Sequence, residues 1–134
     1  PNTVGIAGLR AGIEYVLSKG ISTIRAHEQN LTNKLIQAFR HDQRFVLYGT
    51  TDISKKVGIV SIQVKGFQPA EIGAILDQSF DIAVRPGLHC APFAHQKMGT
   101  FPDGTVRISP GYFNTENDID QIISALGTIA NEKI

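Results

Sequence analysis

The segment KVGIVSIQVKG, residues 56–66, limits the possible folds of this chain more than any other stretch. It is short, rich in Val and Ile, and ends at a glycine, which is typical of a β-strand. Apolar residues at both odd and even positions predict a central strand that is covered on both sides. The segment RFVLYG, residues 44–49, predicts a neighbouring strand, so the fold must contain a sheet.

Two helical patterns fill the residues before this sheet. Apolar residues fall on one face between residues 6 and 17, and Gly20 is expected to end that helix in a left-handed cap. A second helix is expected from near Ser22 to Phe39. His27 lies on its apolar stripe, and we interpret it as a packed, hydrogen-bonded core histidine rather than a ligand.

The second half of the chain also contains patterns typical of helices and strands. Pro69 suits the first position of a third helix, and Thr115 with Asp118 forms the pattern that caps the start of a last one. Short strands are expected at 81–84 and 105–109. The resulting order, α-α-β-β-α-β-β-α, predicts an α+β fold with a mostly antiparallel sheet and helices packed on one face.

Composition excludes several classes of protein. The chain has 134 residues, which fits one domain, and its 13 basic and 12 acidic side chains leave a formal net charge of +1. Such a balance gives no attraction for nucleic acid or an anionic membrane, and no apolar run approaches the roughly 18 residues of a membrane span. A single Cys and no signal peptide indicate a reducing, cytoplasmic setting.

The single cysteine lies in AVRPGLHCAPFAH, residues 83–95, between two prolines and a glycine that restrict the backbone. Catalytic groups often lie on loops that a rigid scaffold positions. Cys90 is therefore a candidate nucleophile, since a nearby cation such as His89 or Arg85 would favour the thiolate. A buried free Cys that acts as a small hydrophobe is the alternative, and the pattern alone leaves both open.

Other chemistry is less well supported by the residues. His89, Cys90 and His95 lack the spacing of a zinc site, so we expect no metal. Arg107 interrupts the strand TVRIS, and its planar guanidinium could bind a carboxylate through two hydrogen bonds, although a surface arginine is the simpler interpretation.

Taken together, AVRPGLHCA, the later GTVRISPGYFNTENDIDQIISAL, and upstream PNTVGIAGLRAGIEYV, LYGT and ILDQSFDIAVR resemble cysteine desulfurases of the class V aminotransferase superfamily. The resemblance covers essentially the whole chain and is closest to the branch with an R-x-G-x-H-C-A motif, which includes selenocysteine lyase-like enzymes. It implies a pyridoxal phosphate (PLP) enzyme of the aspartate aminotransferase fold, fold type I. Such an enzyme is a homodimer that takes sulfur from L-cysteine to give L-alanine and an enzyme persulfide.

The resemblance also implies roles for individual residues. Cys90 matches the nucleophile that becomes the persulfide, and Arg107 matches the arginine that binds the substrate carboxylate. Arg85 and His89 flank the thiol, where Arg85 would help to bind substrate and His89 would tune charge or move protons. Asn2 follows a stretch that in the family reaches the cofactor phosphate of the partner subunit.

Parts of the family pattern are not found in this chain. None of its lysines lies in the family's Schiff-base motif, and there is no initiator Met, so we expect residues 1–20 to be the terminal helix of a preceding PLP-binding large domain and residues 21–134 to be the small C-terminal domain. The isolated chain is then expected neither to hold PLP nor to turn over cysteine. Leu88 stands where the family often has His, and the 17-residue spacing from Cys90 to Arg107 resembles the branch that uses a sulfur-acceptor protein.

Alternatives remain at this point. The chain could be a stand-alone α+β ligand-binding or regulatory module, or a related class V aminotransferase or lyase in which Cys90 is incidental. L-Selenocysteine is also open as the substrate in place of L-cysteine.

Overall fold

The computed structural model describes residues 1–132, which form five α-helices and a four-stranded sheet. The helices span Thr3–Lys19 (α1), Ile21–Phe39 (α2), Pro69–Phe80 (α3), Pro92–Met98 (α4) and Glu116–Asn131 (α5). The strands span Phe45–Tyr48 (β1), Val60–Val64 (β2), Arg85–Gly87 (β3) and Thr105–Ile108 (β4), and a short 3-10 helix covers Ile53–Lys55. The sheet order is β1-β2-β4-β3 and every pairing in it is antiparallel, which confirms the expected α+β fold.

The helices begin and end where the sequence places their caps. Pro69 is the first residue of α3, and Gln68 and Glu71 form a reciprocal capping box there. Thr115 and Asp118 do the same for α5, as their spacing predicts. Gly20 does end α1, but its ψ of 131° lies outside the left-handed region that we expected, because the chain turns at once into α2.

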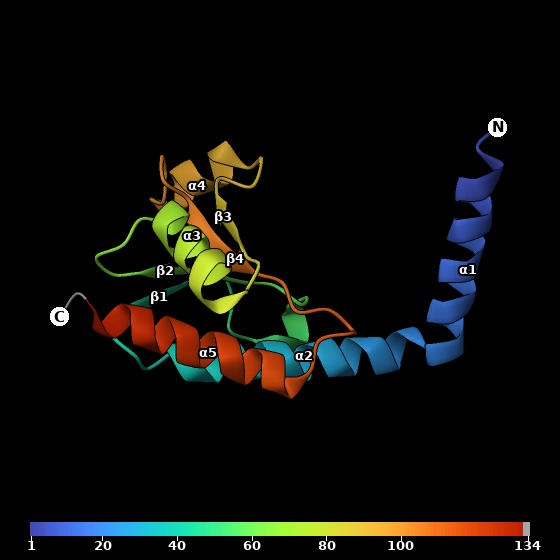
Figure 1. Ribbon diagram of the computed structural model, residues 1–134, viewed down its shortest axis with the longest axis horizontal. Helices are drawn as coiled ribbons and strands as arrows, with labels where there is room; N and C mark the ends of the chain where they lie inside the picture. The colour runs from blue at the N-terminus through green and yellow to red at the C-terminus, as the bar shows by residue number, and fades with distance from the viewer. Residues whose placement is uncertain (133–134) are drawn as a thin grey trace.

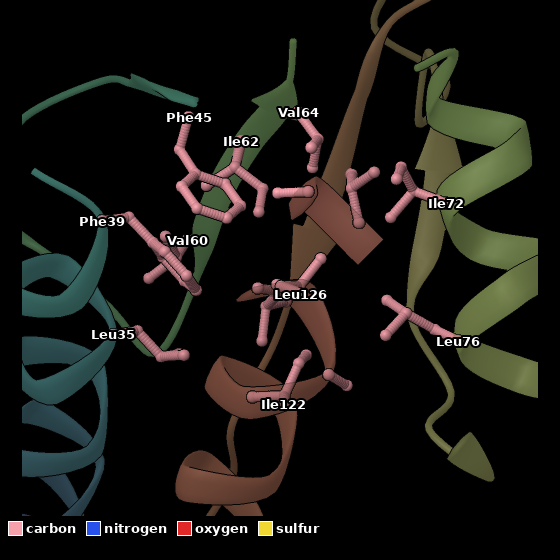
Figure 2. Close-up of a cluster of buried hydrophobic side chains, with 14 of the residues drawn as sticks. Leu35, Phe39, Phe45, Val60, Ile62, Val64, Ile72, Leu76, Ile122 and Leu126 are labelled. Carbon is pink, nitrogen blue, oxygen red and sulfur yellow. The ribbon is translucent and has the colours of Figure 1, made fainter. Parts of the chain in front are cut away.

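The core lies between one face of the sheet and helices α2, α3 and α5 (Figure 2). Alternate residues of β2 point into it, and Phe39 of α2 packs on Phe45 of β1 with ring centroids 4.7 Å apart. The side chains that meet at its centre are Leu35, Val60, Ile62, Ile72, Leu76, Ile122 and Leu126. Such close-packed apolar burial is the main favourable contribution to the stability of a domain of this size.

Three details of the sequence analysis need correction. Residues 81–84 form no strand; the strand is Arg85–Gly87, the arginine, proline and glycine of the turn itself, because these residues pair with β4. β2 is central, but it is not covered equally on both faces: its residues alternate between buried and half-buried, and the buried ones face the core helices. Val57 and Ile59, which were expected to face the other side, precede the strand and are exposed. The helix α4 was not expected, since its seven residues are too few to show a clear apolar period.

Helix α1 has no buried residue and projects away from the rest of the molecule (Figure 1). Its apolar stripe is exposed, with Leu9 and Leu17 at 65% and 68% of their full accessibility. Tyr15 forms ring contacts with Tyr112 and Phe113 in the segment that follows β4. Within residues 1–132, no helix combines the length and hydropathy that crossing a lipid bilayer requires.

Candidate functional site

Cys90 lies in the tight turn between β3 and α4, and its side chain is exposed. His89 and Cys90 both adopt left-handed backbone conformations, with φ of 53° and 60°. For residues other than glycine this conformation costs about 1 kcal/mol or more each, so the surrounding structure must hold the turn in place. The prolines and glycine seen in the sequence restrict the approach to this turn, but its strained residues are the histidine and the cysteine themselves.

Backbone and side-chain hydrogen bonds close the turn. The Ala91 amide donates to the Leu88 carbonyl at 2.9 Å, and the His89 Nε2 lies 2.7 Å from the Arg85 carbonyl oxygen. From β3, the Arg85 Nη2 reaches to 3.9 Å of the Cys90 Sγ. The guanidinium thus places a positive charge beside the sulfur atom.

The backbone of the turn is also supported from β4. A Cβ atom at Gly104 would lie 2.2 Å from the carbonyl carbon and oxygen of Gly87, so only glycine permits this close approach. The Gly104 carbonyl accepts a hydrogen bond from the Gln63 Nε2 at 2.9 Å. Gln63 is held in turn by the Tyr48 hydroxyl, which donates to its Oε1 at 2.6 Å.

His89 is half-buried, and its environment disfavours protonation. Burial lowers its pKa below the ordinary 6.5, and the hydrogen bond to the Arg85 carbonyl opposes this only in part. The positive charges of Arg107 and Arg85 lower the pKa further. The imidazole is therefore neutral at pH 7. Of the two cations that the sequence suggested for Cys90, Arg85 is the one that carries charge there.

Arg107 and Arg85 are direct neighbours across the β3–β4 pairing, and Ser61 of β2 pairs with Arg107 on its other side. Because Val60 and Ile62 of β2 face the helices, this row lies on the opposite face of the sheet. The Nε of Arg107 is buried and has no hydrogen-bond partner within residues 1–132. The Arg107 side chain as a whole is only half-buried, and the planar fork of its guanidinium is suited to a carboxylate.

His95 and Thr100 belong to the same region and were not identified as a pair from the sequence. His95 is buried in α4, its Nδ1 lies 2.7 Å from the Thr100 Oγ1, and its ring meets the His89 ring edge-on at 5.7 Å between centroids. From the sequence, His95 is considered only as a possible metal ligand, and its spacing does not suit a metal site. In the described part of the chain, no group of three or more His, Cys, Asp or Glu residues is placed to bind a metal ion.

The structure brings Cys90, His89, Arg85 and Arg107 together, but Asn2 lies apart from them. Asn2 caps the free end of α1, where its Oδ1 accepts a hydrogen bond from the Gly5 amide at 2.9 Å (Figure 1). His27 is half-buried rather than fully buried; its Nε2 pairs with the Asn114 carbonyl at 2.8 Å and its ring packs on Tyr112. It is hydrogen-bonded, as expected, and lies outside the site.

The residues gathered here suit the binding of an amino-acid substrate better than the binding of PLP itself. Arg107 offers a guanidinium, which can pair with the carboxylate of an amino acid, and Cys90 offers a thiol. Among the hydrogen bonds and ion pairs of residues 1–132, none joins a lysine to Cys90, Arg85 or Arg107. The arrangement could thus bind a carboxylate and accept a group on the Cys90 sulfur.

Comparison with known proteins identifies the family of this chain. The family model described as aminotransferase class-V matches residues 1–122. Cysteine desulfurases from Yersinia pestis and Yersinia pseudotuberculosis are 31% identical over 131 residues, which is 96% of this chain and 30% of theirs. The chain therefore spans about a third of the length of these relatives.

Solved structures of similar proteins agree in fold. The apo structure of a cysteine desulfurase from Thermococcus onnurineus NA1 has a TM-score of 0.92 and 31% identity, over 98% of this chain and 32% of that one. The cysteine desulfurase CsdA of Escherichia coli, in an S-sulfonic acid form, has a TM-score of 0.86 and 23% identity, over 98% of this chain and 31% of its own. The second of these similarities is used for the fold alone.

Proposed function

The chain belongs to the aminotransferase class-V family, and from that premise we propose that it is the C-terminal domain of a PLP-dependent cysteine desulfurase. The observation that carries the proposal is the exposed Cys90 thiol, which lies 3.9 Å from the guanidinium of Arg85, the residue that pairs with Arg107 across β3 and β4. The relatives named cysteine desulfurases support the same function.

Residues 1–20 are proposed to be the last helix of the PLP-binding large domain, and residues 21–134 the small domain. The exposed apolar stripe of α1 supports this division, because a helix normally buries such a face against the domain to which it belongs. Asn2, at the free end of this helix, is proposed to lie near the cofactor phosphate of a partner subunit in a homodimer.

Arg107 is proposed to bind the carboxylate of L-cysteine, with Arg85 completing the positive site. The buried, unpartnered Nε of Arg107 supports this role, since a charge-assisted hydrogen bond would satisfy it. L-Selenocysteine presents the same carboxylate and is the alternative substrate within this proposal.

Cys90 then accepts the sulfur. Its thiolate forms a bond to the substrate sulfur, the bond from that sulfur to the substrate carbon breaks, and the electron pair of that bond stays with the carbon, which gains a proton. L-Cysteine and one enzyme thiol become L-alanine and one enzyme persulfide, so atoms and electrons balance without an external oxidant or reductant. His89, which is neutral at pH 7 and directly precedes Cys90 in the chain, is proposed to receive or return the thiol proton.

The family is PLP-dependent, and PLP supplies an electron sink for the substrate carbon when it is bound. We assign it no contact in this chain beyond the role of Asn2. The exposure of Cys90 supports transfer of the persulfide sulfur to an acceptor protein, and a reducing cytoplasmic setting would keep the thiol free for the next cycle.

The test uses the full-length protein supplied with PLP and L-cysteine. Cys90→Ala is expected to abolish the release of sulfide and of L-alanine, whereas His41→Ala, at an exposed histidine between α2 and β1, should retain both. Retained activity in Cys90→Ala would show that the cysteine is incidental, as in a related class V enzyme.

A second measurement tests the division of the protein. PLP added to the 134-residue chain alone is expected to give no stoichiometric absorbance band that depends on a lysine. Such a band would favour a stand-alone PLP-binding module.

A further inference from the structure

The turn that carries Cys90 has a strained backbone, and contacts from outside the turn help to hold it in place. His89 and Cys90 are consecutive residues in left-handed conformations, and Cys90 is exposed on the outer side. The described contacts that hold His89 are the hydrogen bond to the Arg85 carbonyl and the ring of His95. The orientation of the His89 ring therefore depends on both.

The hydrogen bond fixes which nitrogen of His89 carries the proton. A backbone carbonyl oxygen can only accept, so the His89 Nε2, 2.7 Å from the Arg85 oxygen, must donate. In the neutral ring the other nitrogen, Nδ1, then carries the lone pair. A rotation of the His89 ring would break this hydrogen bond and leave the Arg85 carbonyl without the His89 donor.

His95 limits that rotation. It is buried, unlike most histidines in proteins, and the Thr100 hydroxyl anchors its Nδ1 at 2.7 Å. Thr100 is itself buried, and its amide donates to the His95 carbonyl at 2.9 Å, so the anchor is rigid. The anchored ring meets His89 edge-on, which is a favoured geometry for two aromatic rings.

We propose that His95, anchored by Thr100, is a positioning residue that fixes the His89 ring and through it holds the Cys90 thiol beside Arg85. The proposal deepens the sulfur-transfer function above and rests on it for its purpose. The groups that face His89 are Arg85 on β3, Arg107 on β4 and His95 on α4.

Thr100→Val tests the anchor, because it removes the hydroxyl at nearly constant volume, and Thr100→Ser is the matched variant that keeps it. In the 134-residue chain, NMR titration is expected to show the His89 pKa lowered in the unchanged chain and in Thr100→Ser. In Thr100→Val that pKa should rise toward 6.5, because the ring is less enclosed. Alkylation of Cys90 by iodoacetamide at pH 7 is expected to slow by about threefold or more in Thr100→Val, as the thiol moves away from Arg85.

A merely structural role for His95 would lower the thermal midpoint without moving either readout. An unchanged His89 titration and an unchanged alkylation rate in folded Thr100→Val would therefore overturn the proposal. If that variant does not fold, His95→Phe, which keeps a ring and loses the anchor, is expected to give the same two changes.

Two measurements on the unchanged chain need no variant. Nuclear Overhauser contacts are expected between the His89 and His95 rings, and the His89 proton is expected on Nε2; the absence of the contacts, or a proton on Nδ1, would refute the proposed geometry. None of these readouts requires cofactor or turnover. A protein that lacks desulfurase activity but shows the expected shifts would refute the function and leave the positioning role standing.

Discussion

Arg85 and Arg107 face each other directly across the antiparallel β3–β4 pairing, on the face of the sheet opposite the core helices α2, α3 and α5. Like charges in this position destabilise a sheet, and neither guanidinium forms an ion pair within residues 1–132. An anion bound between or beside them would relieve the repulsion. The pairing therefore supports the carboxylate site proposed above.

Arg107→Ala should weaken substrate binding in the full-length protein. Loss of a charge-assisted hydrogen bond of about 1.5–3 kcal/mol predicts a rise in KM for L-cysteine of about 10-fold to 150-fold. Arg107→Lys keeps the charge but not the planar fork, so an intermediate rise is expected. Steady-state kinetics on the two variants checks this, and a KM equal to that of the unchanged protein in Arg107→Ala would remove Arg107 from the site.

His89 should make the stability of the chain depend on pH. Its pKa in the folded chain lies below the ordinary 6.5, chiefly through burial, so the unfolded chain binds the proton more readily. The corresponding stability is present above pH 6.5 and is lost as the pH falls below it. Urea unfolding at pH 7.5 and 5.5 should show a smaller loss in His89→Gln than in the unchanged chain, with exposed His41→Gln as the control.

Gly104→Ala should disturb the cysteine turn from a distance. The new methyl group would overlap the Gly87 backbone, and Gly104 also has a φ of +80°, so we expect a loss of about 2–4 kcal/mol in the free energy of unfolding. Gly111→Ala is the matched control, because a Cβ there meets nothing within 4 Å. Equal midpoints in urea for both variants would contradict the close approach of the two backbones.

Leu35→Ala and Leu17→Ala should separate the core from helix α1. Leu35 is fully buried, so its truncation is expected to reduce the free energy of unfolding by about 2–5 kcal/mol. Leu17 is 68% exposed, and its truncation should change that free energy by less than about 0.5 kcal/mol. A comparable loss in both variants, measured by chemical denaturation, would mean that α1 packs on the core in solution.

Much of the fold follows from local patterns in the sequence. Pro69 and the Thr115–Asp118 capping box start helices where they were expected, since caps depend on residues only three or four apart. A strand was wrongly predicted at 81–84 because three of these four residues are apolar. The strand is Arg85–Gly87, because these residues pair with β4 although they include a proline and a glycine. Helix α4 could not be predicted, because its seven residues are too few to show a helical period.

The candidate site, like the fold, depends partly on the local sequence and partly on the tertiary structure. The sequence by itself determined the chemistry that this region can offer: one thiol, a histidine beside it and two arginines, on a turn restricted by proline and glycine. Only the tertiary structure decided that Arg85 and Arg107 are partners, that Arg85 rather than His89 carries charge beside the thiol, and that His95 with Thr100 supports the turn. The reason is physical, because strand register, burial and the field of neighbouring charges arise from contacts between residues far apart in the chain.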